Sequence, residues 1–259
     1  MKFTIVVPCF NEEQRLDPEP WCKFVQGRQD VDFLFVDDGS SDGTYDVLLR
    51  IVEQCPQGIR AMKLPRNGGK AEAVRQGILA AVDAGAEGVG FWDADLATPL
   101  DAIPLLIAPF VRAEVGVAMG SRVRLLGRHV EREAARHWFG RATALAASLV
   151  LGVHVYDTQC GAKLLRPGRH VVALFGAPFS SRWAFDVELL ARWIGAVGGP
   201  EAARETLVEV PLPKWSDVAG SKLRPRDFAI TPLELAKIAW RYRSAAGTGV
   251  AARRSAKER

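Results

Sequence analysis

Two carboxylates, Asp93 and Asp95, stand one residue apart where the apolar run "GVGFW" gives way to "LATP". Because side chains alternate along an extended backbone, both can point the same way and hold one hard cation, directly or through water. Mg²⁺ prefers such oxygen ligands and often shares itself with substrate phosphates. Alternatively, Asp95, directly before "LATP", caps a helix that begins near Pro99, and the spacing alone does not decide between these interpretations.

Two other segments combine polar side chains with glycines. "VDDGSSDGT" places Asp37 and Asp38 before a tight turn, a geometry in which an aspartate accepts hydrogen bonds from a base or a ribose. "RNGGKAEA" places Lys70 at a helix start, where free N–H groups, the helix dipole and an ammonium can face a phosphate. It lacks the spacing of a Walker loop. An ordinary Asx turn and an ordinary loop remain the alternatives for the two segments.

The first 122 residues alternate short β-rich runs with amphipathic stretches of helical period. We expect strands at 3–10, 31–40, 59–65, 88–95 and 115–122, and helices at 43–54, 70–85 and 99–113. Such alternation predicts an α/β fold with a mostly parallel central sheet flanked by helices. Ligands of open α/β sheets bind outside the carboxyl ends of the strands, so the polar clusters are expected to share one crevice.

The remainder of the chain follows a different pattern. We expect a long helix over 131–155, a turn and strand over 156–165, a helix over 180–198 and a strand over 206–215. Thr231, Pro232 and Glu234 form a capping-box pattern that predicts a helix start at Thr231. Residues 1–243 are interpreted as a single domain, and the small, basic segment 244–259 as a disordered tail.

Length and composition agree with one large globular domain. The chain has 259 residues, of which 48% are hydrophobic and 25% charged. The start "MKFTIVVPCFNEE" is expected to be a strand and not a signal peptide, and no apolar run reaches the roughly 20 residues of a membrane span. The four cysteines are scattered without metal-ligand spacing, so we expect free thiols in a reducing cytoplasm.

Positive charge is concentrated at the C-terminal end. From Lys214 onward there are eleven Lys or Arg against four Asp or Glu, a net charge of +7, which leaves −3 for the preceding residues. This asymmetry argues against a general nucleic-acid binder and for a cationic end that meets an anionic partner.

The C-terminal helix has side chains suited to an anionic membrane surface. Leu233, Ala236 and Trp240 lie along one side, with Lys237 and Arg241 next to them. We therefore expect peripheral contact with a membrane. Alternatively, the apolar side chains of this helix pack on the domain and leave a solvated basic rim.

Taken in order, the motifs resemble those of family-2 glycosyltransferases of the GT-A, Rossmann-like fold. The motifs are "VVPCFNEE", "VDDGSSDGT", "NGGKAEAVRQG", "DADLATP", "GSR", "DTQCGAKLL", "RWAFDVELL" and "GSKL". They extend over residues 3–223 and look most like those of dolichyl-phosphate β-glucosyltransferases, with polyprenyl-phosphate mannose synthases as near relatives. Mannose synthases have a Gln where this chain has Ala97, which favours the glucosyltransferase branch. Ala162, by contrast, stands where an aromatic residue is usual.

The resemblance implies roles for individual residues. It makes Asp93 and Asp95 the ligands of Mg²⁺ or Mn²⁺, and it places Arg122 and Lys222 near the donor diphosphate and the acceptor phosphate. The expected catalytic set is Asp157, Asp186, Arg122 and Lys222. The expected nucleotide-sugar-binding set is Pro8, Phe10, Glu12, Asp37, Lys70, Asp93, Gln159, Trp183 and Glu188.

The activity implied is inverting, metal-dependent transfer of a hexose, glucose from UDP-glucose, to a polyprenyl or dolichyl phosphate. A lipid phosphate is already anionic and needs no strong general base, so Asp157 and Asp186 would orient it. With a hydroxyl acceptor, one of them would be a true base. The alternatives are a soluble transferase acting on a sugar, glycerate or secondary-metabolite hydroxyl, and a non-catalytic sugar-nucleotide binding module.

Overall fold

The computed structural model of the chain describes residues 1–123, 125–131, 134–166, 168–182, 184–216, 218 and 225–242. The predicted site residues Trp183 and Lys222 lie outside these ranges. The predicted basic tail, 244–259, lies outside them as well.

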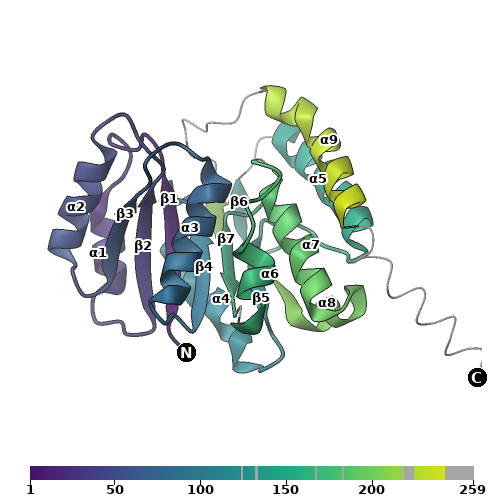
Figure 1. Cartoon of the computed structure of the whole chain (residues 1–259), viewed down its shortest axis with the longest axis horizontal. Coiled ribbons are helices and arrows are strands. Elements are labelled where there is room, and N and C mark those ends of the chain that lie inside the picture. The colour runs from purple at the N-terminus through teal and green to yellow at the C-terminus, as the bar shows by residue number, and fades with distance from the viewer. Residues whose placement is uncertain are drawn as a thin grey trace, which may run out of the picture.

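Seven strands of the described chain form one sheet in the order β3-β2-β1-β4-β7-β5-β8 (Figure 1). They are β1 (Phe3–Cys9), β2 (Val31–Asp37), β3 (Ile59–Lys63), β4 (Gly88–Trp92), β5 (Val117–Ser121), β7 (Ala162–Leu165) and β8 (Leu207–Pro211). Neighbouring strands are parallel, except that β7 runs antiparallel to both β4 and β5. The predicted α/β class and mostly parallel sheet are therefore confirmed.

A second, two-stranded sheet pairs β6 (His129–Glu131) in parallel with β9 (Lys214–Ser216). The strand expected over 206–215 is thus divided between two sheets. The break lies at Leu212 and Pro213, and proline has no N–H to donate to a ladder.

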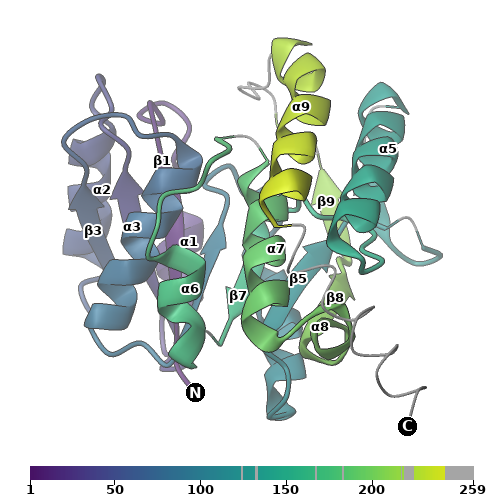
Figure 2. The ribbon, with the colours of Figure 1, turned by 45° about the vertical axis from the view of Figure 1, so that its right-hand side comes forward.

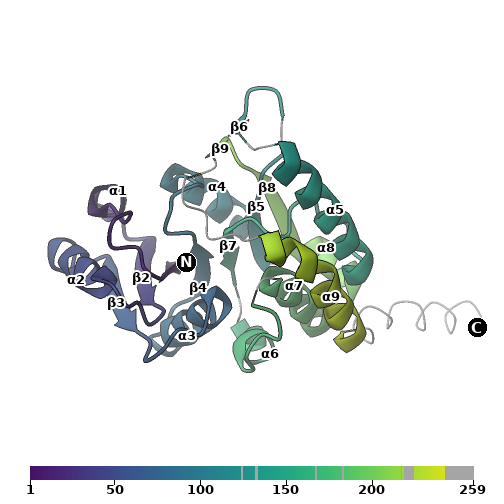
Figure 3. The same ribbon diagram turned by 90° about the horizontal axis from the view of Figure 1, so that it is seen from above.

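Helices cover both faces of the large sheet (Figures 1 and 3). The α-helices in the described ranges are α1 (Pro18–Val25), α2 (Thr44–Gln54), α3 (Lys70–Asp83), α4 (Ile103–Ile107), α5 (Ala134–Leu151), α6 (Val171–Phe175), α7 (Phe185–Val197), α8 (Pro200–Thr206) and α9 (Pro225–Arg241). Short 3₁₀ turns are η1 (Leu100–Ala102), η2 (Ala108–Val111) and η3 (Gly168–His170). In this part of the chain, no helix combines the length and the apolar character needed to span a membrane.

The alternation of side chains along the strands explains the two-sided core. Phe3, Ile5 and Val7 of β1 are buried with α1, α2 and α4 on one face of the sheet. Val6 faces the other way and is buried with residues of α3, α6 and α7. A third cluster joins the buried sides of α5, α7 and α9, which lie next to one another (Figure 2). The sheet is therefore buried on both faces, as a parallel sheet requires.

Two helix predictions are corrected by the structure. The helix expected over 99–113 is interrupted and becomes η1, α4 and η2, because Pro104 and Pro109 cannot donate backbone hydrogen bonds. The predicted start at Thr231 is also wrong, since α9 begins at Pro225 and contains Pro232 in its interior. A proline costs a helix one hydrogen bond but does not forbid it, and Pro225 takes the first helical position, where proline is favoured.

The cysteines differ from the expectation of four free thiols. Cys22 of α1 and Cys55, which follows α2, form a disulfide with a Cα–Cα distance of 5.8 Å, whereas Cys9 and Cys160 are free and buried. The pair is 33 residues apart in the sequence, and only the packing of α1 beside α2 brings the two together.

Gly77 allows α3 to lie close to the sheet, which gives a test of this packing. A Cβ at Gly77 would stand 2.6 Å from Val6 Cγ1 and 2.9 Å from Val36 Cγ2. We expect Gly77→Ala to lower the free energy of unfolding by about 1–3 kcal/mol, measured by urea denaturation. The control Asp83→Ala, at an exposed position of the same helix, is expected to change it by less than about 0.5 kcal/mol. If the urea midpoint of Gly77→Ala equals that of the wild type, α3 does not lie as close to the sheet as described.

Candidate active site

The polar clusters that follow β1, β2 and β4 lie at one edge of the sheet. The three strands are adjacent and parallel, and Cys9 at the end of β1 is paired with Asp37 at the end of β2. Pro8 and Phe10, predicted to contact the nucleotide, are both half-buried at this edge. The shared edge agrees with the expectation of one crevice outside the carboxyl ends of the strands.

Asp37 is fully buried and has one unsatisfied oxygen. Its Oδ1 accepts a hydrogen bond from the Ser40 N–H at 3.0 Å. Its Oδ2 has no hydrogen-bond partner in the described ranges, and the Lys63 ammonium lies 3.8 Å away. A buried carboxylate oxygen without a donor is costly, and the nearby Lys63 ammonium offsets part of that cost; the predicted contact of Asp37 with the nucleotide stays a prediction.

Glu12 is held by its neighbours on the loop after β1. The Arg15 guanidinium binds both carboxylate oxygens of Glu12 at 2.7–2.9 Å. The backbone N–H of Glu12 donates to Thr44 Oγ1 at the start of α2. The loop after β1 is thereby fixed to the loop after β2. Glu12 is buried, and its predicted contact with the nucleotide stays a prediction.

Asp38 holds the glycine-rich loop that leads into α3. Its two oxygens accept the N–H groups of Gly68 and Gly69, each at 2.8 Å. Burial raises the pKa of Asp38, and these two hydrogen bonds oppose the rise. Gly69 has φ 91°, a conformation that favours glycine, and Lys70 follows it as the first residue of the helix.

Lys70 lies against Asp93, a pairing that the sequence did not predict. Its ammonium is 2.5 Å from Asp93 Oδ1 and within 6.0 Å of the ring centroids of Phe91 and Phe185. Burial lowers the pKa of Lys70, but the carboxylates of Asp93, Asp186 and Asp95 together outweigh it and leave a net rise. The Asp93 N–H donates to the Gly161 carbonyl at 3.1 Å, and a Cβ at Gly161 would overlap the Asp93 carboxylate. The Asp93 side chain therefore requires glycine at position 161.

Asp95 is exposed, and its Oδ1 accepts the N–H of Ala97 at 3.0 Å. The 3₁₀ turn η1 has Pro99 as its N-cap and no side-chain cap, so neither aspartate caps it. Although Asp95 is exposed, its carboxylate is partly desolvated by the surrounding chain. This desolvation, together with the charge of Asp93, raises the pKa of Asp95. A cation between the two carboxylates would relieve this repulsion.

The donor set fits a hard divalent cation. No cluster of three or more metal-binding side chains occurs among the residues that the structure describes. Asp93 and Asp95 offer carboxylate oxygens, and Mg²⁺ is commonly held by one or two carboxylates plus water and substrate phosphates.

Arg122 and Asp157 form a nearly buried fork beside this edge. The Arg122 backbone N–H and Nε donate to Asp157 Oδ2 at 3.0 and 2.6 Å, and its Nη2 donates to Oδ1 at 2.8 Å. Behind them, Glu209 of β8 accepts the backbone N–H groups of Tyr156 and Asp157. Gln159, a predicted nucleotide-sugar-binding residue, is half-buried, and its backbone N–H donates to Asp157 Oδ1 at 3.2 Å. Glu209, which the sequence did not single out, thus fixes the backbone on which Asp157 stands.

Asp186, at the start of α7, pairs with a buried lysine. The Lys163 side chain is 0% exposed, and its ammonium donates to Asp186 Oδ1 at 2.5 Å and to the Cys160 carbonyl at 2.6 Å. Lys163 was missed by the sequence-based assignment. The available signal was a lysine within the apolar strand "AKLL", because a lysine is rarely buried unless it is paired.

Glu188 does not reach the crevice in this arrangement. Its side chain is 0% exposed, and its carboxylate is bound by Ser180, Arg192 and Tyr242. Burial raises the pKa of Glu188, but these hydrogen bonds outweigh it and lower the pKa overall. The geometry therefore gives Glu188 a role in holding the chain around α7, and the predicted nucleotide-sugar contact gains no support from it.

The fold and this edge of the sheet are those of a glycosyltransferase. The chain belongs to the family described as "Glycosyl transferase family 2", whose sequence model matches residues 4–167, more than half of the chain. The expected family is therefore confirmed.

Several curated relatives are similar over most of the chain. A Mus musculus protein named dolichyl-phosphate beta-glucosyltransferase is 31% identical over 250 residues, which cover 86% of this chain and 70% of the relative. A Drosophila melanogaster protein of the same name is also 31% identical over 250 residues, covering 87% and 70%. A Pseudomonas fluorescens protein named undecaprenyl-phosphate 4-deoxy-4-formamido-L-arabinose transferase is 30% identical over 174 residues, covering 65% and 47%.

Solved structures agree on the fold. A crystal structure of M. tuberculosis glucosyl-3-phosphoglycerate synthase has a TM-score of 0.64 at 17% identity and covers 93% of this chain and 80% of that chain. A complex of the same enzyme with Mn²⁺, UDP and glucosyl-3-phosphoglycerate has a TM-score of 0.63 at 18% identity, covering 92% and 80%. At these identities the likeness shows a GT-A-like fold and nothing more.

The thiols near this edge provide a chemical test of the structure. Burial, with a smaller effect of Asp157, raises the pKa of Cys160 to about 11, so only about one thiol in a thousand is ionised at pH 8. We expect iodoacetamide at pH 8 to leave the native protein unmodified in intact-mass measurements. Unfolding without reductant is expected to add two labels, on Cys9 and Cys160, and reduction to add two more. Four labels without reductant would contradict the disulfide.

Proposed function

We propose that this protein transfers glucose from UDP-glucose to a dolichyl or related polyprenyl phosphate, inverting the anomeric centre. The relatives named dolichyl-phosphate beta-glucosyltransferase support the reaction, because they match 86% or more of the chain at about 30% identity. The class of acceptor is argued from the charge pairing at the site.

The observation that carries the acceptor proposal is that both predicted catalytic carboxylates are already paired. Asp157 is held by three hydrogen bonds from Arg122, and Asp186 by the buried Lys163. A carboxylate bound to a cation is a weak proton acceptor, because the cation favours its charged form. An acceptor phosphate needs no deprotonation at neutral pH, whereas a hydroxyl does. The pairing therefore favours a phosphate acceptor, which the Arg122 guanidinium, held in place by Asp157, would attract.

The choice of glucose rests on the relatives named dolichyl-phosphate beta-glucosyltransferase. Asp37 at the end of β2 is the residue expected to meet the base, but uracil and guanine alike offer an N–H for its Oδ2. Ala97 supports glucose over mannose only through the family resemblance. Lys70 would add positive charge beside the donor diphosphate.

Asp93 and Asp95 would hold a Mg²⁺ or Mn²⁺ ion. Such an ion stabilises the negative charge that develops on a departing diphosphate. Other residues of the chain position the Asp93 carboxylate. The Gly161 carbonyl accepts the backbone N–H of Asp93, and the Lys70 ammonium pairs with one of the carboxylate oxygens.

We also propose peripheral contact with an anionic membrane through α9. Leu235 and Ile238 are buried against the domain, whereas Leu233 and Trp240 are 58% and 79% exposed. Leu233, Lys237 and Trp240 are spaced so that they share the helix side opposite the buried one. The neighbouring helix α5 adds two exposed leucines, Leu145 and Leu149. An exposed apolar side with basic residues is typical of helices that lie at a lipid surface.

A donor and acceptor screen tests the proposed function. We expect glucose transfer from UDP-glucose to polyprenyl phosphate in the presence of Mg²⁺ or Mn²⁺, detected as radiolabelled lipid, with GDP-mannose at least about ten times less effective. The acceptor panel includes sugars, glycerate derivatives and other hydroxyl compounds. Transfer only to hydroxyl acceptors would replace the lipid proposal, and donor binding without transfer or hydrolysis would indicate a non-catalytic protein.

The metal assignment predicts a large effect of Asp95→Asn. The amide is a poorer ligand than the carboxylate, so we expect turnover to fall by about 100-fold or more with an unchanged melting temperature. EDTA is expected to abolish wild-type activity, and Mg²⁺ or Mn²⁺ to restore it. Asp101→Asn, an exposed aspartate on η1, is the matched control and is expected to be fully active. Full activity of Asp95→Asn in chelated buffer would exclude the assignment.

A further inference from the structure

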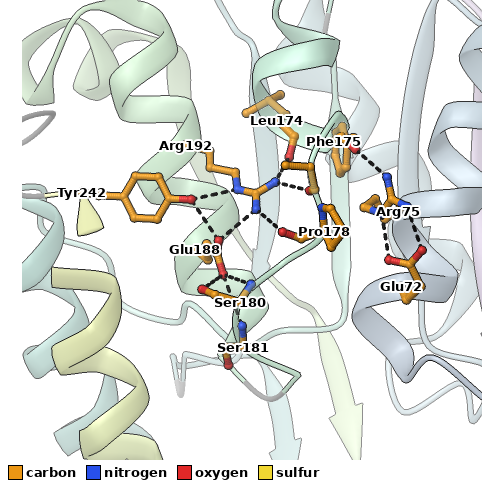
Figure 4. A network of polar contacts seen from close by, with 11 residues as sticks. Glu72, Arg75, Leu174, Phe175, Pro178, Ser180, Ser181, Glu188, Arg192 and Tyr242 are labelled. Atoms are coloured by element: carbon orange, nitrogen blue, oxygen red, sulfur yellow. Dashed lines mark hydrogen bonds and ion pairs between the residues drawn. The ribbon is translucent and has the colours of Figure 1, made fainter. Parts of the chain in front are cut away.

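A buried polar network connects α9 with the segment 176–182, which leads into α7 (Figure 4). Glu188 of α7 is at its centre. One carboxylate oxygen, Oε2, accepts the N–H and Oγ–H of Ser180 at 2.8 and 2.6 Å. The other, Oε1, accepts from Arg192 Nη2 and from the Tyr242 hydroxyl, each at 2.9 Å. Because Tyr242 directly follows α9, the carboxylate links that helix to the segment.

Arg192 uses its remaining donors to fix the backbone of the same segment and of the end of α6 before it. Its Nη1 donates to the carbonyls of Leu174 and Ala177 at 2.7 and 2.8 Å, and its Nη2 to that of Pro178 at 2.8 Å. Its Nε donates to the Tyr242 hydroxyl at 3.1 Å. The Tyr242 hydroxyl therefore touches both members of the buried Glu188–Arg192 pair (Figure 4).

A second contact from α9 reaches the entrance of α7. Ser181 Oγ lies 2.7 Å from Glu234 Oε2 of α9, and it accepts the N–H of Ala184 at 2.6 Å. Asp186 stands two residues after Ala184, in the first turn of α7. A change in the position of α9 would therefore act directly on the turn that places Asp186.

The segment also contacts the loop that places Lys70. Arg182 Nη2 donates to Asn67 Oδ1 at 2.9 Å, and its guanidinium is so close to Gly69 that a Cβ there would stand 2.7 Å from Nε. On the other side, Arg75 of α3 donates to the Phe175 carbonyl at 3.1 Å and is itself held by Glu72. The segment thus spans from α9 to the helix whose first residue pairs with Asp93.

We infer that Tyr242 and Glu234 are positioning residues that transmit the placement of α9 on a membrane to the segment 176–182. The segment in turn positions Asp186 and Arg182 for transfer to a lipid acceptor. The outer side of α9 carries Leu233 and Trp240, and its inner side carries the two polar contacts. One helix therefore meets both the lipid surface and the active-site segment. The inference rests on the proposed lipid-phosphate acceptor, and its test includes a measurement that requires no transfer.

The test compares the wild type with Tyr242→Phe and Glu234→Ala. Tyr242→Phe keeps the ring and removes the hydroxyl, and the matched control Tyr45→Phe makes the same change on α2. Amide hydrogen exchange is followed over residues 176–184, with and without vesicles of anionic phospholipid. We expect vesicles to slow exchange in the wild type and the control, and to slow it at least about threefold less in both variants, with Tyr242→Phe binding vesicles as well as the wild type by sedimentation.

Kinetics provide the second readout. With polyprenyl phosphate in the same vesicles, we expect kcat/KM for the lipid to fall about fivefold or more in Tyr242→Phe, with the KM for UDP-glucose unchanged. A parallel rise of the UDP-glucose KM would indicate general disruption and overturn the positioning role.

The outcomes separate the inference from the proposed function. Equal protection of residues 176–184 in the wild type and both variants would overturn the inference even if glucose transfer is observed. A wild type that binds no vesicles would overturn it as well. Altered protection in the variants without transfer to any lipid phosphate would support the link between α9 and the segment, and would show that the proposed function is wrong.

Discussion

The structure depends on three carboxylates near the carboxyl edge of the sheet, each of which pairs with a cation from another part of the fold. Asp93 pairs with Lys70 of α3, Asp157 with Arg122 after β5, and Asp186 with Lys163 of β7. The Arg122–Asp157 and Lys163–Asp186 pairs are buried, and a buried charge without a partner would cost several kcal/mol, so each of these pairs fixes the relative position of the two elements that supply it. The Lys70–Asp93 pair is partly exposed, and water weakens it. The charges that suit the site to a sugar diphosphate therefore also hold the site together.

The pairing has a chemical consequence. Carboxylates bound by arginine or lysine are weak bases, and they hold the cationic side chains of Arg122 and Lys70 at the crevice. Such a site is better suited to joining two phosphorylated partners than to activating a hydroxyl. Asp93 and Asp95 differ from the buried carboxylates of the site, because Asp93 is partly exposed, although paired, and Asp95 is exposed. An incoming metal cation would therefore meet these two carboxylates first.

The outer helices extend this arrangement. The Glu188–Arg192 pair has no access to the crevice, yet it holds the carbonyls of the segment before α7 and receives the hydroxyl of Tyr242. A buried pair of this kind stabilises little in itself, but it selects one conformation of the segment because any other would leave charges unpaired. The C-terminal helix is in this way structurally part of the site, although it lies outside the sheet (Figure 2).

The sequence by itself determined the α/β class, most strand positions and the placement of Asp37 and Asp93 near one edge, because hydrophobic period and strand ends are local properties. It could not show that β7 is antiparallel, that Pro232 is inside α9, or that Cys22 meets Cys55. Lys70–Asp93, Lys163–Asp186 and Glu188–Tyr242 join residues 23 to 54 positions apart. Only the tertiary structure decided these partners, because a charge is satisfied by whatever packing brings within about 3 Å, and sequence spacing does not encode that distance.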